Sequence, residues 1–145
     1  MPRWPAERVD VDAYPAPGLD LPIFYNDLDT NGHLNNVALG RFFEHSRFAG
    51  NVSAGLREAQ RPTGSHFLVG RVAIDYLLEG RYGETLHVRT RTGRVGTSSI
   101  VLEQAAWQQG ACLGLAEVVL VHLIDGRPAP VTPALRSVLE SMRVG

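Results

Sequence analysis

The chain contains no lysine, and all 14 of its basic residues are arginines. A phosphate-binding loop of the Gly-x-x-x-x-Gly-Lys-Ser/Thr type needs a lysine, so this nucleotide-binding motif is excluded. The formal net charge of −1 leaves no excess of positive charge to attract a phosphate backbone. We therefore expect no nucleic-acid partner.

Cysteine and long apolar runs are also scarce. Cys112 is the only cysteine, which excludes an intrachain disulfide and is typical of a reducing compartment. No run approaches the roughly 20 apolar residues that span a bilayer, and the first residues lack the apolar stretch of a signal peptide. The sequence therefore predicts a cytoplasmic protein without membrane association.

What is present fits one ordinary globular domain over residues 1–145. Hydrophobic residues make up 44% and charged residues 20% of the chain, and a chain of this length can bury a real core. Four prolines fall within residues 1–18. Proline is poorly compatible with helix interiors and central strands, so this segment is predicted to be an irregular N-terminal arm.

The next residues predict a short strand and then a buried helix. Residues 21–25 form an apolar run that favours a strand. From Ala38 to Ala49, apolar residues recur at spacings of three and four, which indicates a helix with a wide apolar face. Asn35 or Asn36 is a suitable N-cap, and Gly50 is a suitable end.

The remainder of the chain predicts four long strands and a last helix. The strands are expected at His66–Leu78, Thr85–Val95, Thr97–Gln108 and Ala111–Ile124. Short glycine-containing turns between them predict antiparallel hairpins. Thr132-Pro133 then begins an amphipathic helix. The fold class is thus α+β, with a long antiparallel sheet wrapped around a buried helix and an edge that a second copy could cover.

The residues that carry chemistry are concentrated in residues 25–36. Asp27, Asp29 and His33 stand immediately before the apolar helix, whose first N–H groups lack intrahelical acceptors. Such groups can stabilise an oxyanion, while a carboxylate attacks a carbonyl carbon or deprotonates water. Asp, Asn and Gly are also the usual residues of turns, and composition alone favours a structural turn.

A family resemblance favours the catalytic interpretation. The run Asp27-Leu28-Asp29-Thr30-Asn31-Gly32-His33-Leu34-Asn35-Asn36, followed by Glu44-His45-Ser46-Arg47, resembles hotdog-fold thioesterases related to 4-hydroxybenzoyl-CoA thioesterase. Weaker landmarks follow at residues 72–76, 83–86, 94–99 and 125–128, so the likeness covers most of residues 20–140. It implies a hotdog fold that hydrolyses an acyl-CoA thioester without metal or cofactor, as a homodimer or homotetramer.

The resemblance also implies roles for single residues. Asp29 matches the catalytic carboxylate, as nucleophile or general base, and the backbone N–H of Asn36 matches the group that polarises the thioester carbonyl. Gly32 would let the loop pass close to the substrate. His33 belongs to the same catalytic motif. The predicted substrate-binding residues are Tyr25, Asn35, Leu39, Arg94, Ser98 and Ser99, the last three at the nucleotide end of CoA.

Four alternatives use the same residues. An EF-hand calcium loop would begin at Asp27, but its twelfth position, which needs a bidentate Glu, is Ala38. A hotdog hydratase would need a histidine where Leu34 stands. A hotdog domain could also bind acyl-CoA without turnover. Glu44 is a further candidate carboxylate, although helical spacing favours its pairing with Arg41 or Arg47. Many relatives have Tyr at the position of Leu39, so the acyl pocket has its own shape here.

Overall fold

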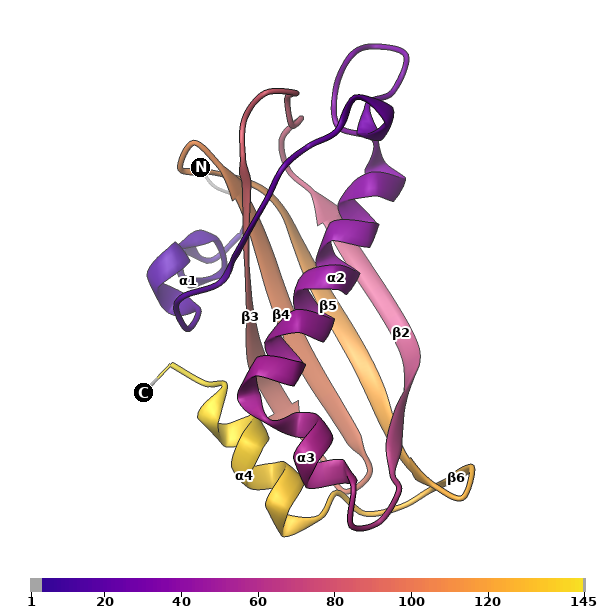
Figure 1. The fold of residues 1–145 in the computed structure, drawn as a ribbon. Coiled ribbons are helices and arrows are strands. Elements are labelled where there is room, and N and C mark those ends of the chain that lie inside the picture. Colours follow the sequence, from indigo (N-terminus) through magenta and orange to yellow (C-terminus); the bar gives the residue numbers. More distant parts are fainter. Residues whose placement is uncertain (1–3, 145) are drawn as a thin grey trace.

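A long helix, α2 (Asn36–Ala54), lies along one face of a curved antiparallel sheet (Figure 1). The computed structural model describes residues 4–144; residues 1–3 and 145 of the predicted domain lie outside the described residues. The strands are β1 Leu19–Leu21, β2 His66–Tyr76, β3 Leu86–Val95, β4 Ser99–Gln108, β5 Ala111–Ile124 and β6 Arg127–Pro128. This confirms the expected α+β class and the hotdog arrangement of helix and sheet.

The order of the sheet leaves one long edge free. The strands follow the order β1-β3-β4-β5-β2, with β6 beside β5, and all pairs are antiparallel. Strand β1 covers one edge with only three residues, whereas β2 pairs with β5 over its full length and has no neighbour on its other side within residues 4–144. An uncovered long strand presents unpaired backbone groups to a further strand.

The two faces of the sheet bury different elements. Ile100, Leu102 and Ala106 alternate along β4 and face α2 and the C-terminal helix α4 (Pro133–Ser141). Between them, Ala105 and Trp107 face the other side. The core is therefore split between both faces of one sheet, and the larger part lies under α2.

The N-terminal arm covers the second face. Two short helical turns, α1 (Ala6–Val9) and a 3₁₀ turn at Val11–Ala13, lie within it. Tyr14 follows them and packs edge-on against Trp107, with ring centroids 5.6 Å apart. The Arg91 guanidinium donates to the Ala13 carbonyl at 2.8 Å, and burial raises the pKa of Tyr14 to about 12. The arm is thus held by specific contacts.

Two sequence-based boundaries were wrong. The first strand is Leu19–Leu21, and Tyr25–Asp27 form a 3₁₀ turn because the Asp27 carboxylate accepts the Phe24 N–H at 2.8 Å. The helix also does not end at Gly50. It continues to Ala54 and ends at Gly55, whose φ of 90° is left-handed, before the short helix α3 (Leu56–Gln60).

Alanine substitutions at these two glycines should change the free energy of unfolding in opposite directions. A Cβ at Gly50 would have open space, and a helix interior favours alanine, so Gly50→Ala should raise the free energy of unfolding by about 1 kcal/mol. Gly55→Ala should lower it by about 1 kcal/mol because its left-handed backbone disfavours a Cβ. Urea unfolding of both variants measures this. Equal shifts of the same sign would contradict the assigned helix end.

Helix α4 begins where the sequence predicts. The Thr132 hydroxyl accepts the Leu135 N–H at 3.3 Å, and Pro133 occupies the first turn. Leu135 and Leu139 are fully buried in one cluster with Ile100 and Leu102 of β4. This helix therefore closes the end of the core opposite to the start of α2 (Figure 1).

Candidate active site

A tight loop presents Asp29 in front of α2. The Asp29 N–H donates to the His33 carbonyl at 2.8 Å, and the Gly32 N–H donates to the Asp29 carbonyl at 3.1 Å. Gly32 has a φ of 76°, and nothing lies within 4 Å of the position that its Cβ would occupy. The turn therefore requires glycine for its backbone conformation rather than for space.

One carboxylate oxygen of Asp29 is held and the other is free. Oδ1 accepts the Asn31 N–H at 2.8 Å and the His33 N–H at 3.1 Å. No hydrogen bond to Oδ2 forms within residues 4–144, and the side chain is exposed. Two backbone donors to Oδ1 fix the orientation of the carboxylate. The conformation of the loop therefore sets the position of Oδ2.

The start of α2 supplies a backbone donor beside this carboxylate. Asn35 is the N-cap, and its Oδ1 accepts the Val37 N–H at 2.7 Å. The first intrahelical bond runs from the Leu39 N–H to the Asn35 carbonyl at 3.0 Å. Asn36 is the first helical residue, so its N–H has no acceptor inside the helix and lies at the positive end of the helix dipole.

Asp27, unlike Asp29, is buried and has a hydrogen bond to each of its carboxylate oxygens. It is 2% exposed, and its carboxylate accepts the Phe24 N–H at 2.8 Å and the Arg41 guanidinium at 2.9 Å. Its carbonyl accepts the Asn35 N–H at 2.8 Å, which ties the loop to the start of α2. With both carboxylate oxygens engaged, Asp27 supports the loop and is not available as the first ligand of an EF-hand.

We expect Asp27→Ala to lower the free energy of unfolding by about 2–3 kcal/mol, since it leaves a backbone donor and a charged partner without an acceptor. Arg41→Ala should cost less than about 1 kcal/mol because that side chain is 62% exposed. Chemical denaturation of both variants tests the difference. An equal loss in both would mean that the ion pair, rather than the backbone bond, supports the loop.

A cavity of about 280 Å³ opens next to Asp29. Its lining residues come from the loop, the start of α2 and the end of β2, and they are Asp29, His33, Leu34, Asn36, Leu39, Tyr76, Leu77, Leu78, Glu79 and Gly80. The Leu34 N–H donates to the Gly80 carbonyl at 2.9 Å, which joins the two segments. Of the predicted site residues, the four that line this cavity are Asp29, His33, Asn36 and Leu39.

Tyr76 and Glu79 were not predicted as site residues. The Tyr76 hydroxyl donates to the Asn36 carbonyl at 3.4 Å, from a position 40 residues away along the chain. Glu79 Oε2 lies 3.3 Å from His33 Nδ1. The only sequence signal is that residues 72–76 form a family landmark, and the two contacts arise from packing of the end of β2 on the loop.

Other predicted site residues lie outside the cavity. Tyr25 is 81% exposed in the 3₁₀ turn, and Asn35 is occupied as the N-cap. Arg94, Ser98 and Ser99 lie around the β3–β4 turn. Strand β3 is about 30 Å long and begins at the Asp29 end of the molecule, so these three residues are at the opposite end. One chain does not bring them to Asp29.

Glu44 is exposed on α2 and does not line the cavity. Its expected ion pairs with Arg41 and Arg47 are wrong. Arg41 binds Asp27, whereas Arg47 is 8% exposed and donates to Gln104 Oε1 at 3.1 Å. Burial lowers the pKa of Arg47, and the charge of Glu44 partly opposes this effect. Arg47 therefore belongs to the core.

Comparisons with known proteins identify one family and several solved structures of similar fold. The sequence profile of the thioesterase-like superfamily matches residues 25–139. A thioesterase from Thermus thermophilus, solved in complex with coenzyme A and Zn, is 31% identical; the match covers 86% of this chain and 91% of that one, with a TM-score of 0.71. The comparison with curated proteins returned no match.

Two further solved structures share the fold at lower identity. The PA5185 protein from Pseudomonas aeruginosa strain PAO1 is 23% identical, with coverage of 91% and 94% and a TM-score of 0.78. YbaW from Escherichia coli is 19% identical, with coverage of 86% and 97% and a TM-score of 0.78. Over the described residues, no helix has the length and apolar character needed to cross a membrane.

Proposed function

Because this chain belongs to the thioesterase-like superfamily, we propose that it hydrolyses an acyl-CoA thioester to a carboxylic acid and CoA, with Asp29 as the catalytic carboxylate. Thioester hydrolysis is the activity of this superfamily in general. The observation that carries the finer proposal is that Asp29 and the first residue of α2 line the same cavity. A coenzyme A complex of the Thermus thermophilus thioesterase supports CoA as the thiol carrier.

The Asn36 N–H provides the electrostatic part of the reaction. A thioester carbonyl bound with its oxygen at this N–H is polarised, and the negative charge that develops on the oxygen is stabilised by the helix dipole. The donor is already in place, since Asn35 caps the helix and the Tyr76 hydroxyl holds the Asn36 carbonyl. No reorganisation is needed when the charge develops.

Asp29 provides the attacking group in one of two ways. As a general base, Oδ2 takes a proton from water, and the hydroxide adds to the carbonyl carbon. As a nucleophile, Oδ2 adds directly and forms a mixed anhydride that water then hydrolyses. In both routes the C–S bond breaks, and CoA leaves as a thiolate that takes up a proton. His33, beside Glu79, keeps the loop oriented toward the cavity.

The acyl group enters the cavity beside Leu39 and Leu34. Leu39 and Leu34 are buried in the core beneath the cavity, whereas most of the surface that the cavity exposes is polar. Its volume of about 280 Å³ lies just below the usual range of small-molecule sites. A cavity of this size favours a short aliphatic or an aromatic acyl group over a long chain.

We further propose that the working unit is a dimer formed through β2. Leu68, Val69 and Val72 are exposed by 55%, 46% and 48% on the free edge strand. Antiparallel pairing of β2 with its copy reverses the partner chain. The β3–β4 turn of the partner, which carries the partner's Arg94 and the partner's Ser98, then lies at the Asp29 end of the first chain. A few strand spacings, or about 15 Å, separate this turn from β2 of the first chain. A CoA molecule can span that distance.

The experiment that tests the function is release of free thiol from a panel of short, medium, long-chain and aromatic acyl-CoAs. Turnover of at least one class is the expected result. Binding of acyl-CoA without turnover of any thioester would replace the enzyme with a non-catalytic acyl-CoA-binding protein. The same panel identifies the acyl group that the cavity accepts.

A further inference from the structure

A second and larger cavity lies away from Asp29. It has a volume of about 440 Å³, is partly open to solvent, and is bordered by residues 15–19, the second half of α2, β3 and the end of α4. None of its lining residues borders the Asp29 cavity. Ser46, in its wall, is ten residues beyond Asn36, which places it about 15 Å further along the helix axis. The volume of this second cavity falls within the range of small-molecule sites.

The cavity exists because one face of α2 carries only small side chains. Ser46, Ala49, Gly50 and Ser53 follow one another at helical spacing and line the space. Earlier turns of the same helix present Leu39 and Phe43, which fill the core. The opposite wall includes Val88 and Thr90 of β3. Most of the surface is therefore apolar, apart from a few hydroxyl groups.

Two hydroxyl groups on this surface are able to donate to a ligand. Ser46 is 4% exposed, and its Oγ has no hydrogen-bond partner within the described chain. The Thr90 hydroxyl accepts from Gln104 Nε2 at 2.9 Å, which leaves its own proton available. A buried hydroxyl without a partner is unfavourable, so Ser46 would gain from a ligand that supplies one.

A chain of hydrogen bonds makes Thr90 a better donor. Arg47 donates to Gln104 Oε1 at 3.1 Å, and Gln104 in turn donates to Thr90. These two bonds run in series to Thr90, which lines the cavity, and hydrogen bonds in series strengthen one another. Gln104 Nε2 also donates to the Phe43 carbonyl at 2.9 Å. Arg47 is a buried cation without an ion pair within 4 Å among residues 4–144. The field at Thr90 thus favours an acceptor, and best an anionic one.

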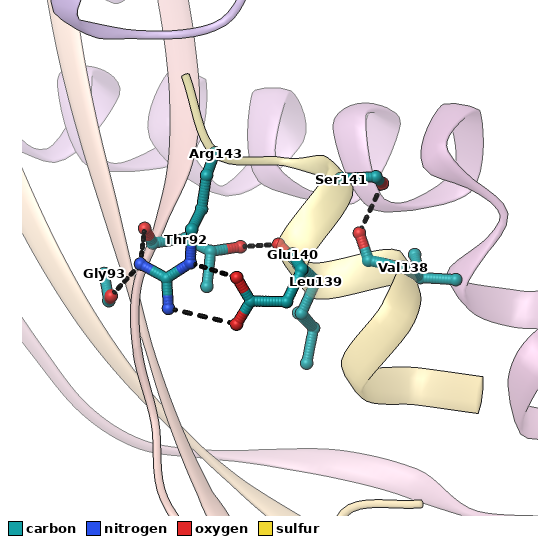
Figure 2. A network of polar contacts seen from close by, with 7 residues as sticks. All are labelled: Thr92, Gly93, Val138, Leu139, Glu140, Ser141 and Arg143. Atoms are coloured by element: carbon teal, nitrogen blue, oxygen red, sulfur yellow. Dashed lines mark hydrogen bonds and ion pairs between the residues drawn. The ribbon is translucent and has the colours of Figure 1, made fainter. Parts of the chain in front are cut away.

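The wall formed by the end of α4 is fixed in place (Figure 2). Arg143 donates to the Gly93 carbonyl at 2.6 Å and pairs with Glu140 at 2.7 Å, while the Thr92 hydroxyl donates to the Leu139 carbonyl at 2.6 Å. These contacts hold Ser141 and Met142, which line the cavity, against β3. A preformed wall lowers the ordering cost of binding.

We propose that this cavity binds an aliphatic carboxylic acid, with its chain along the small-residue face of α2 and its carboxylate accepting from Ser46 and Thr90. Acids of this class are the products of the proposed hydrolysis. Only the identification of the ligand as a reaction product rests on the proposed function. The acyl group of an acyl-CoA carries the same aliphatic chain with an uncharged thioester carbonyl in place of the carboxylate, so the test includes both forms.

The test is binding of octanoate by calorimetry to the full chain carrying Asp29→Ala, which leaves the second cavity intact and should turn over the thioester used below about 10³-fold more slowly. Gly50→Leu should abolish octanoate binding because its side chain occupies the cavity, and a Cβ at this position meets no atom within 4 Å. Ser46→Ala and Thr90→Val should each weaken binding about 3–10-fold. Octylammonium, which has the same chain and no acceptor, should bind at least 10-fold more weakly.

Several outcomes would overturn the proposal. Octanoate binding that survives Gly50→Leu places the acid elsewhere, and unchanged affinity in both hydroxyl variants removes the carboxylate contact. Octanoyl-CoA bound to the Asp29→Ala protein should be unaffected by Gly50→Leu; its loss would make the cavity an acyl channel rather than an acid site. Failure of the proposed hydrolysis would appear in the thiol assay alone, so the two are distinguishable.

Discussion

Asp29→Ala is expected to lower kcat for thioester hydrolysis by about 10³-fold or more. A positioned base contributes typically 10²–10⁴-fold, and loss of a nucleophile removes the direct route completely. KM should change little because the rest of the cavity lining is untouched. Thiol release from the preferred acyl-CoA measures both constants.

Asp29→Asn separates charge from geometry. Its amide oxygen can still accept the Asn31 and His33 N–H groups, so the loop keeps its conformation while the negative charge is lost. We expect activity as low as in Asp29→Ala. Activity close to wild type in Asp29→Asn would reduce Asp29 to a turn residue, which is the role that loop composition alone suggests.

Glu44→Ala is the matched control. Glu44 is an exposed acid on α2, the helix that follows the Asp29 loop, and it does not line the cavity, so its removal should leave kcat within about twofold. Asp29→Ala itself should cost about 1 kcal/mol or less in stability because the hydrogen bonds that it loses are exposed. A collapse in Glu44→Ala instead would move the catalytic carboxylate onto the helix.

The Asp29 loop and the first turn of α2 could be predicted from the sequence because the contacts that determine them are local. Asn35 caps α2 through a bond two residues away, and Gly32 sets the turn between Asp29 and His33. Such contacts recur wherever the same short pattern occurs. The helix end could not be predicted in this way, since Gly50 and Gly55 are both acceptable stops and only packing of α2 on the sheet decides between them.

The parts that were missed depend on contacts distant in sequence. Tyr76 reaches Asn36 only because β2 ends beside the loop, and Arg47 is buried because Gln104 of β4 faces it. Helical spacing alone favoured a surface ion pair for Arg47. The second cavity is also invisible to periodicity, which marks where small residues stand and not whether a neighbour fills the space that they leave.

Lysine at both Val69 and Val72 should convert the protein to monomers and lower hydrolysis at least about 10-fold. Both residues are close to half-exposed on the free edge of β2. Pairing of this edge with its copy would bring like charges together across the twofold axis, and lysines on edge strands oppose further pairing. Sedimentation velocity measures the size, and thiol release measures the activity of the same sample.

Activity should fall when the dimer is lost, because within a single chain Asp29 and the proposed CoA-binding residues lie at opposite ends of the sheet. Asp29 lies at the end of the sheet where β3 begins, whereas Arg94 lies near the other end of β3, which is about 30 Å long. If the partner's Arg94 region holds CoA, the monomer should lose mainly in KM, because Asp29 and the Asn36 N–H remain within one chain. Arg94→Ala should then reproduce the rise in KM without changing the size.

Val144→Arg provides the control for an exposed apolar residue outside the edge. Val144 is 51% exposed beyond α4, and a charge there should alter neither the size nor the activity. A dimer that persists in the double lysine variant would mean that another surface pairs the chains. A fully active monomer would mean that a single chain binds its substrate alone, and that Arg94, Ser98 and Ser99 have no part in holding CoA.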